Sequence, residues 1–79
     1  MTLDQLSINE TATITKINCD RILKNRFYSL GVVKSSQLTV KEKTLTNSTV
    51  EIEINNSKIA LRMNEASKIE VTKIWKKLK

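Results

Sequence analysis

Few side chains in this sequence could carry out catalysis. The chain has no histidine, so the side chain that most often acts as a general base near neutral pH is missing. Cys19 could act as a nucleophile, but it has no histidine to activate it. Glu51 and Glu53 could be paired carboxylates, although their spacing also suits the solvated face of a strand. We predict no catalytic residue and a chain that is not an enzyme.

Ligands for metals and phosphates are also scarce. One cysteine, no histidine and eight scattered acids do not supply the clustered ligands that zinc or iron sites need. Gly31 is the single glycine, which excludes a glycine-rich phosphate loop. We therefore expect no metal site and no cofactor.

The positive charge is concentrated at the C-terminus. Four lysines in residues 73–79 account for four of the net +6 charges, which leaves 6 − 4 = +2 for residues 1–72. We expect a domain over residues 1–72 and a basic C-terminal tail over residues 73–79, with Trp75 packed on the domain or helping to dock a surface. Tyr28 beside Lys24 offers a thin platform for bases, so a small barrel that binds RNA or a single nucleic-acid strand remains an alternative.

The composition also bears on location. A lone cysteine cannot form an internal disulfide, which suits a reducing compartment. No export signal is visible at the start, and no apolar run approaches the roughly 18 residues of a membrane span. We expect a cytoplasmic protein with no membrane span.

Period-two alternation of apolar and polar residues is the dominant pattern. It predicts five short strands with one buried face, rich in Thr, Val and Ile. The alternating apolar pairs and triplets are Ala12 and Ile14; Leu38 and Val40; Val50, Ile52 and Ile54; Ile59 and Leu61; and Ile69 and Val71.

One hairpin can be tested by its register. If Asn55 and Asn56 form a two-residue loop, Ile52 faces Ile59 and Glu53 faces Lys58. Asparagine tolerates the positive φ that such a loop requires, and a shift of one residue would destroy the agreement on both faces. The pattern therefore predicts a hairpin turning at these two asparagines.

A helix is expected between the first two strands. Over residues 20–30 the apolar side chains follow helical spacing in one stripe, which comprises Ile22, Leu23, Phe27 and Leu30. Asn18 is the expected N-cap and Gly31 the left-handed C-cap. Shorter turns are expected at residues 3–6 and 64–67. The order favours a mainly β fold, a small barrel of about five strands whose open end is closed by the helix through Phe27 and Leu30.

The segment Arg26–Gly31 (RFYSLG) is similar to the Arg-Leu-x-x-Leu-Gly signature of the FeoA family, small ferrous iron transport proteins. The opening Leu3 and Leu6, the first strand and the segments around 59–62 and 65–71 also resemble that family, so the likeness covers roughly residues 3–72. The family usually has glycine near Asn9 and Pro-Gly or similar at residues 35–36. Its central hairpin loop often reads Gly-Asp-Pro where this chain has Thr-Asn-Ser at residues 46–48. Asparagine and serine make comparable turns.

The resemblance implies an SH3-like barrel that works as a cytoplasmic accessory of bacterial ferrous iron uptake. It also implies a partner, FeoB, the membrane iron permease with a cytoplasmic GTPase domain. The family's members are not considered enzymes. Weak self-association through barrel edges is compatible with this function.

The expected partner-binding surface is the end of the helix and the loop after it. Two valines follow the C-cap in a segment too short for the core to bury both, and an apolar pair rimmed by basic residues suits a partner. The residues of this surface are Arg26, Tyr28, Leu30, Val32, Val33 and Lys34. The alternative is that both valines pack under the loop.

Overall fold

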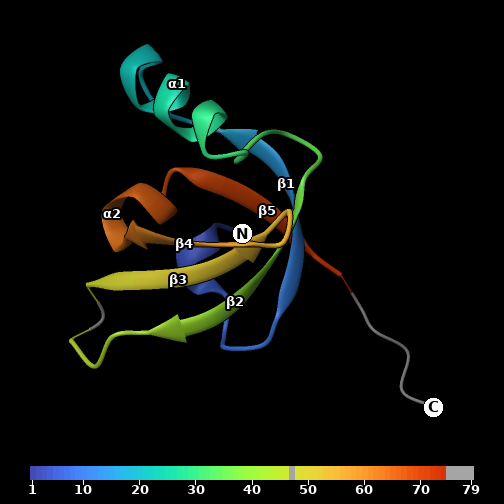
Figure 1. The fold of residues 1–79 in the computed structure, drawn as a ribbon, viewed down its shortest axis with the longest axis vertical. Helices are drawn as coiled ribbons and strands as arrows, with labels where there is room; N and C mark the ends of the chain where they lie inside the picture. Colours follow the sequence, from blue (N-terminus) through green and yellow to red (C-terminus); the bar gives the residue numbers. More distant parts are fainter. Residues whose placement is uncertain (47, 75–79) are drawn as a thin grey trace.

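The computed structural model describes residues 1–46 and 48–74, in which five antiparallel strands form one sheet in the order β4-β3-β2-β1-β5. The strands curve around a shared interior, α1 stands at one end of them, and α2 lies at the end of β4 (Figure 1). This confirms the predicted mainly β fold with a helix after the first strand. In chain order the elements are η1 (Leu3–Gln5), β1 (Thr11–Ile17), α1 (Arg21–Ser29), β2 (Gln37–Lys43), β3 (Thr49–Ile54), β4 (Ser57–Arg62), α2 (Met63–Ala66) and β5 (Ile69–Lys73).

The core is built from the inward faces of the strands. Burial alternates along β3, where Val50, Ile52 and Ile54 are buried between half-buried neighbours, as the period-two pattern predicts. Side chains from η1, α1 and the segments beside them close the ends of this interior. Each large aliphatic side chain buried there contributes about 1.5–3 kcal/mol relative to an exposed one. The buried apolar residues are Leu3, Leu6, Ala12, Ile14, Phe27, Val32, Leu38, Val40, Val50, Ile52, Ile54, Leu61, Ala66, Ile69 and Val71.

The hairpin between β3 and β4 has the predicted register. Ile52 pairs with Ile59 and Glu53 with Lys58. Asn55 and Asn56 have φ of 53° and 64°, so both occupy the left-handed region that a tight two-residue turn demands. This prediction is confirmed.

The start of α1 differs from the prediction. Asp20, and not Asn18, is the N-cap: its carboxylate accepts the N–H of Leu23 at 2.9 Å. Asn18 is instead tied to the sheet, because its backbone N–H donates to the Lys68 carbonyl at 2.7 Å and its side-chain amide donates to Glu70. Two good capping residues stand close together here, and the pairing of β1 with β5 claims the first of them.

The apolar stripe of α1 is only half used. Phe27 is fully buried and Leu23 packs partly against the core, but Ile22 is 84% exposed and Leu30 is 37% exposed. The helix stands at the end of the sheet rather than along it (Figure 1), so its outer turn is largely uncovered by the part of the chain that the structure describes. The prediction that Phe27 and Leu30 together plug the interior is therefore wrong for Leu30.

Besides the two hairpin asparagines, three described loop residues adopt the left-handed conformation that glycine favours. Gly31 ends α1 with φ +84°, and the N–H of Val32 donates to the Phe27 carbonyl at 2.8 Å, which confirms the predicted C-cap. Asn9 and Ser35 have φ of 73° and 78°. Both lie at or beside the positions where the resemblance implies glycine, near Asn9 and within residues 35–36, so asparagine and serine make these turns at some conformational cost.

The fold continues past the boundary expected at residue 72. Lys73 is the last residue of β5, and the N–H of Ile74 donates to the Thr11 carbonyl at 2.9 Å. Met1 also bonds to β5, because the N–H of Val71 donates to the Met1 carbonyl at 2.8 Å. The remaining residues of the expected tail, Trp75 among them, lie outside the described residues, as does Asn47.

Replacing Gly31 tests the C-cap. Any other residue at this position would have an unfavourable φ of +84°, and its Cβ would lie 2.9 Å from the Asn55 side-chain nitrogen. We expect Gly31→Ala to lower the free energy of unfolding by about 1 kcal/mol in urea denaturation. The double variant Gly31→Ala/Asn55→Gly removes the close contact and should keep most of that loss. Full recovery in the double variant would show that crowding, and not φ, is the cause.

Candidate partner-binding surface

The six residues expected to bind a partner lie together, but the structure gives them different environments. They occupy the second half of α1 and the loop that leads to β2. Arg26 is held by an ion pair, Val32 is buried, and the other four remain at least partly exposed.

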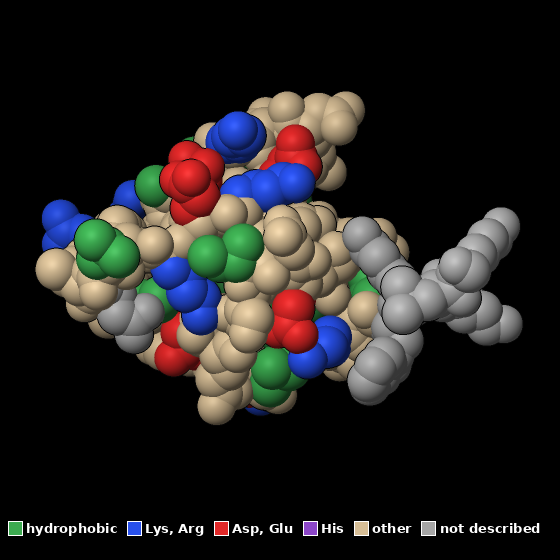
Figure 2. Space-filling view, turned by 90° about the horizontal axis from the view of Figure 1, so that it is seen from below, with side chains coloured by type: hydrophobic (Ala, Val, Ile, Leu, Met, Phe, Trp, Pro, Cys, Tyr) green, Lys and Arg blue, Asp and Glu red, His purple; other side chains and the backbone are tan. Residues whose placement is uncertain are grey.

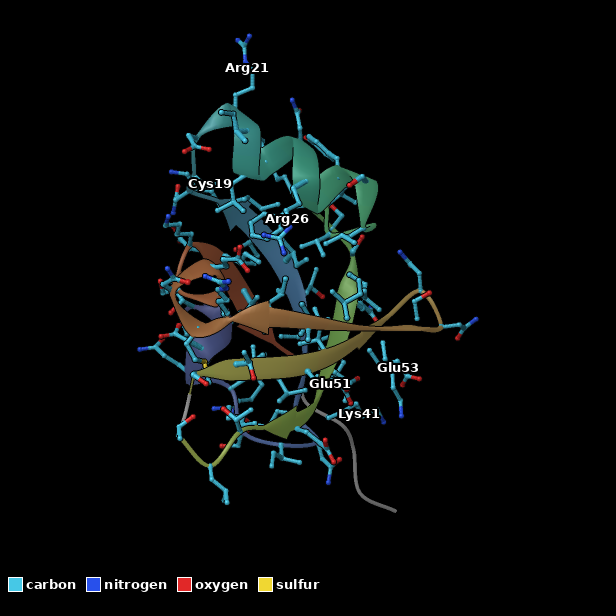
Figure 3. The ribbon with its side chains drawn as sticks, turned by 60° about the vertical axis from the view of Figure 1, so that its left-hand side comes forward. Cys19, Arg21, Arg26, Lys41, Glu51 and Glu53 are labelled. Carbon is cyan, nitrogen blue, oxygen red and sulfur yellow. The ribbon has the colours of Figure 1, made fainter. Side chains whose placement is uncertain are left out.

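Arg26 joins α1 to α2. Its Nη1 donates to Glu65 Oε2 at 2.6 Å, and the Glu65 side chain is only 11% exposed. The other carboxylate oxygen, Oε1, accepts the backbone N–H of Arg62 at 3.1 Å, so it also caps the start of α2. Figure 3 shows Arg26 reaching from α1 toward the sheet, whereas Arg21 points away from the molecule. Arg26 thus positions the helix, although its side chain stays 55% exposed.

The loop after Gly31 turns into the core. Val32 is 0% exposed, so it cannot contact a partner and does not belong to the surface. Val33 is half-buried, and Leu30 before the turn is exposed at the rim. The core therefore takes one valine fully and the other in part, because the left-handed glycine directs the chain inward at once.

Tyr28 and Lys34 border a cavity of about 260 Å³ between α1 and β1. We call this cavity the basic pocket. Three of its lining side chains are lysines, and none of the described residues that line it is acidic. The lining residues are Thr15, Lys16, Ile17, Lys24, Tyr28 and Lys34.

A β-bulge explains how three consecutive residues of β1 border one cavity. In a regular strand neighbouring side chains point to opposite faces. The pairing of β1 with β5 shifts between Ile14 and Lys16, which leaves Thr15 as the extra residue. Such a bulge redirects side chains locally. It allows Thr15, Lys16 and Ile17 to lie along the same wall.

The opposite wall is held by backbone hydrogen bonds. Ser35 donates its N–H to the Ile14 carbonyl at 2.8 Å, and Ile14 donates its own to the Ser36 carbonyl at 2.9 Å. These bonds fix the turn that carries Lys34 against β1. Tyr28 is fixed by the buried Phe27 beside it and by the C-cap that follows.

Sequence reasoning found half of this pocket. Tyr28 and Lys34 are among the expected surface residues, and Lys24 beside Tyr28 is the platform of the nucleic-acid alternative. A spacing of four residues places Lys24 and Tyr28 on one helix face. Lys16, Ile17 and Thr15 were missed. A strand pattern assigns Lys16 to a solvated face, and nothing in the residue types marks the bulge that brings it to α1.

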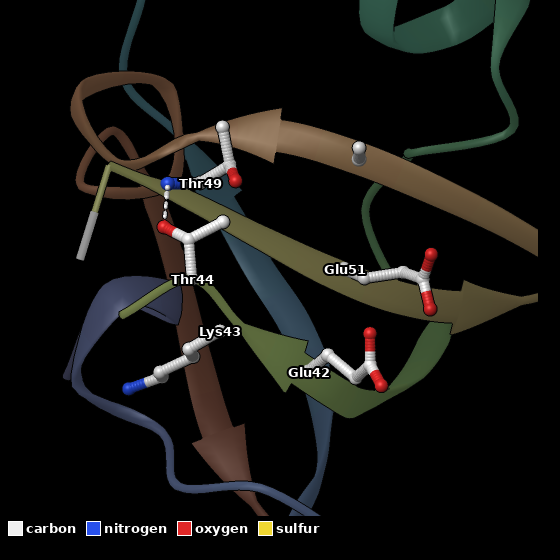
Figure 4. A pocket seen from close by; sticks show the side chains of 6 residues that line it. Glu42, Lys43, Thr44, Thr49 and Glu51 are labelled. Atoms are coloured by element: carbon white, nitrogen blue, oxygen red, sulfur yellow. Dashed lines mark hydrogen bonds between the residues drawn. The ribbon is translucent and has the colours of Figure 1, made fainter. Parts of the chain in front are cut away.

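A second, smaller cavity of about 190 Å³ lies over β2 and β3 (Figure 4). Its carboxylates, Glu42 and Glu51, are direct partners across the two strands, and Thr44 Oγ1 accepts the N–H of Thr49 at 3.2 Å. Among the described residues no group of three His, Cys, Asp or Glu side chains could hold a metal ion. Glu53 does not join this pair, because Lys41 Nζ lies 3.5 Å from its carboxylate.

One face of the molecule carries mixed charge. On the face shown in Figure 2, acidic and basic side chains are interspersed and apolar side chains form small separate patches. Cys19 is half-buried and packs against the core, as expected of a packing residue. No helix in the described part of the chain is long and apolar enough to cross a membrane.

Glu10 forms an ion pair that ties the start of β1 to β5. Its Oε2 lies 2.5 Å from Lys73 Nζ, and its Oε1 accepts the N–H of Ser7 at 2.6 Å. The hydrogen bond from Lys73, followed by that from Ser7, holds the pKa of the Glu10 carboxyl below its usual value. The ionised form of Glu10 is thus favoured by folding.

Five antiparallel strands curved around one core, with a helix inserted between β1 and β2, define a small SH3-like domain. A solution structure of the FeoA protein from Chlorobium tepidum superimposes with a TM-score of 0.90 at 25% identity, covering 95% of this chain and 71% of that one. The structure of Stenotrophomonas maltophilia FeoA, described as a prokaryotic SH3 domain protein complexed with zinc, matches with a TM-score of 0.79 at 22% identity over 91% of this chain and 89% of that one.

The sequence comparison specifies the family. The FeoA domain family model matches residues 1–73. A Campylobacter jejuni protein named Fe(2+) transport protein A is 38% identical over 74 residues, which cover 94% of this chain and 100% of that protein. The chain therefore belongs to the FeoA family, and the resemblance seen in its sequence is confirmed.

The ion pair between the two helices is expected to stabilise the fold. Arg26→Met would leave the largely buried Glu65 carboxylate without its cation. We expect a loss of about 1–2 kcal/mol in the free energy of unfolding, less than for a fully buried pair because Arg26 is half-exposed. A double-mutant cycle with Glu65→Gln measures the coupling between the two side chains. Additive effects in that cycle would show that the pair does not contribute.

Acid should weaken the tie between Glu10 and Lys73. Because the pKa of Glu10 is lower in the folded state, its contribution is present above the unfolded pKa and is lost as the pH falls through the folded value. We expect Glu10→Gln and Lys73→Gln each to flatten the acidic part of the plot of unfolding free energy against pH. Urea denaturation over a pH series measures this. Plots parallel to that of the wild type would contradict the assignment.

Proposed function

We propose that this chain is a cytoplasmic accessory protein of bacterial ferrous iron uptake and acts by binding the cytoplasmic side of a FeoB-type permease. The observation that carries the proposal is the FeoA family match over residues 1–73, together with the relative named for Fe(2+) transport. Membership of this family supports a role in ferrous iron transport. Contact with the permease is the further step that needs a test.

The exposed end of α1 supplies the docking surface in this proposal. Tyr28 is 53% exposed and Leu30 is 37% exposed, and both lie close in sequence to the half-buried Val33 and to Lys34. Exposed aromatic and aliphatic side chains with a basic rim are suited to protein partners. Arg26 lies at the border of this surface, where its pairing with Glu65 keeps the helix in place.

Nucleic-acid binding is the second candidate, and the basic pocket is the observation in its favour. Tyr28 and three lysines resemble a minimal base-stacking site with phosphate contacts. In the described part of the chain the other aromatic ring, Phe27, is fully buried. A single exposed ring stacks one base, whereas strand-binding domains combine several rings along a groove. The accessory function is therefore the better supported of the two.

Titration of the labelled chain with the purified cytoplasmic domain of the ferrous iron permease tests the proposal. A short single-stranded RNA runs in parallel at the same salt concentration. We expect saturable binding to the permease domain that weakens less with salt than RNA binding does, because its apolar contacts, unlike ion pairs and phosphate contacts, do not depend on counterion release. RNA binding that falls steeply with salt, with no permease binding, would favour the second candidate and overturn the first.

A matched pair of variants locates the surface. We expect Leu30→Asp to weaken permease binding by about tenfold or more, because it places a charge in the apolar contact. Leu45→Asp is the control: Leu45 is 106% exposed in the turn between β2 and β3 and lies outside the proposed surface. Equal affinity of the Leu30→Asp variant and the wild type would remove the end of α1 from the interface.

A further inference from the structure

We propose that the basic pocket binds a carboxylate side chain from an acidic segment of the partner protein. The identity of that partner as the permease rests on the proposed function above. The pocket itself can be tested without the permease.

The first argument is uncompensated charge. Lys16, Lys24 and Lys34 border one cavity and are all exposed, yet none of them forms an ion pair with a described residue. By contrast, Arg26, Lys41 and Lys73 each lie within 4.0 Å of a carboxylate. Like charges gathered around one cavity repel, and a bound anion relieves that repulsion.

The second argument is that the pocket offers donors to a ligand. Each of the three ammonium groups donates hydrogen bonds, and the Tyr28 hydroxyl can add another. Thr15 uses its own hydroxyl proton on the Glu70 carbonyl at 3.2 Å, so it forms part of the wall. A set of donors with excess positive charge suits a ligand that is acceptor-only, and an ionised carboxylate is one.

The apolar part of the lining favours a side chain over a free inorganic ion. Ile17 is half-buried and, with the ring of Tyr28, provides apolar surface next to the three lysines. The methylene groups of a glutamate would pack there while its carboxylate meets the ammonium groups. A cavity of about 260 Å³ has room for one such side chain and its neighbouring backbone.

Phosphate fits this lining less well. Dedicated phosphate sites usually combine lysine with the forked donors of arginine or with backbone N–H groups of a glycine-rich loop or a helix N-terminus. The described lining of the basic pocket has lysines as point charges and no arginine, and its helix residues, Lys24 and Tyr28, come from the middle and the end of α1. Among the described lining residues Tyr28 is the one aromatic side chain, and one ring is too short a platform for a nucleic-acid strand.

The test is an NMR titration of the ¹⁵N-labelled chain with a short poly-glutamate peptide. We expect saturable shifts in the amide signals of Lys16, Ile17, Lys24, Tyr28 and Lys34. The triple variant Lys16→Gln/Lys24→Gln/Lys34→Gln should weaken binding by about tenfold or more. These side chains are exposed, and the amide spectrum of the variant reports whether the fold is intact.

A matched control separates the pocket from overall charge. The variant Arg21→Gln/Lys58→Gln/Lys68→Gln also removes three exposed positive charges, but none of these residues lines the pocket. It should bind the peptide nearly as well as the wild type. An equal loss in both variants would mean that net charge alone attracts the peptide, which would overturn the pocket.

Other outcomes distinguish this proposal from the proposed function. No saturable shift with the peptide, or shifts with inorganic phosphate or single-stranded RNA in its place, would overturn the carboxylate assignment. Permease binding that the pocket variant leaves unchanged would keep the accessory function and reject the pocket as its docking point. Peptide binding at the pocket without any permease binding would reject the proposed function and keep the pocket.

Discussion

The burial of the Phe27 side chain, which extends from α1 into the core, is the contact on which the partner-binding surface depends. Most of the helix is exposed, so this one ring, helped by Leu23, anchors it to the core. The neighbouring Arg26 then reaches Glu65 on α2, and Gly31 returns the chain into the core at Val32. The family signature around residues 26–31 thus contains the residues that attach α1 to the rest of the fold. An arginine sets the orientation, an apolar side chain provides the anchor, and a glycine makes the turn.

The strands could be predicted because the alternation of apolar and polar residues assigns each side chain to one face of a strand. The hairpin at Asn55 and Asn56 satisfied its two faces in a single register, and the structure has that register. The burial of the helix residues was harder to predict. An apolar stripe shows which side chains could be buried, but it does not show how much of the helix the sheet covers. Ile22 belongs to the stripe and remains exposed at the outer turn. Local rules also offered two caps, Asn18 and Asp20, and pairing with a distant strand decided between them.

The candidate site was predictable where it follows the helix and unpredictable where it follows the sheet. Tyr28 and Lys24 share a helix face by spacing alone, so their proximity could be inferred. Lys16 enters the basic pocket through the bulge at Thr15, which arises from the pairing of β1 with β5. That pairing joins segments more than fifty residues apart in the sequence, so it cannot be predicted from local composition. Val32 was misplaced for the opposite reason: it looks like surface in a short loop, yet the turn at Gly31 places it inside.

The pairing of β1 with β5 also governs when this protein can acquire its structure. β1 lies between β2 and β5, so one of its two edges stays open until β5 has been made. Met1 and Thr2 then bond to β5 as well, and Ile74 bonds back to β1. Contacts between segments this far apart in the sequence carry a larger loop-closure cost than local ones and form slowly. A chain still being translated therefore lacks the strand that completes its sheet and Lys73, the ion-pair partner of Glu10. The sheet is completed only after β5 has left the ribosome.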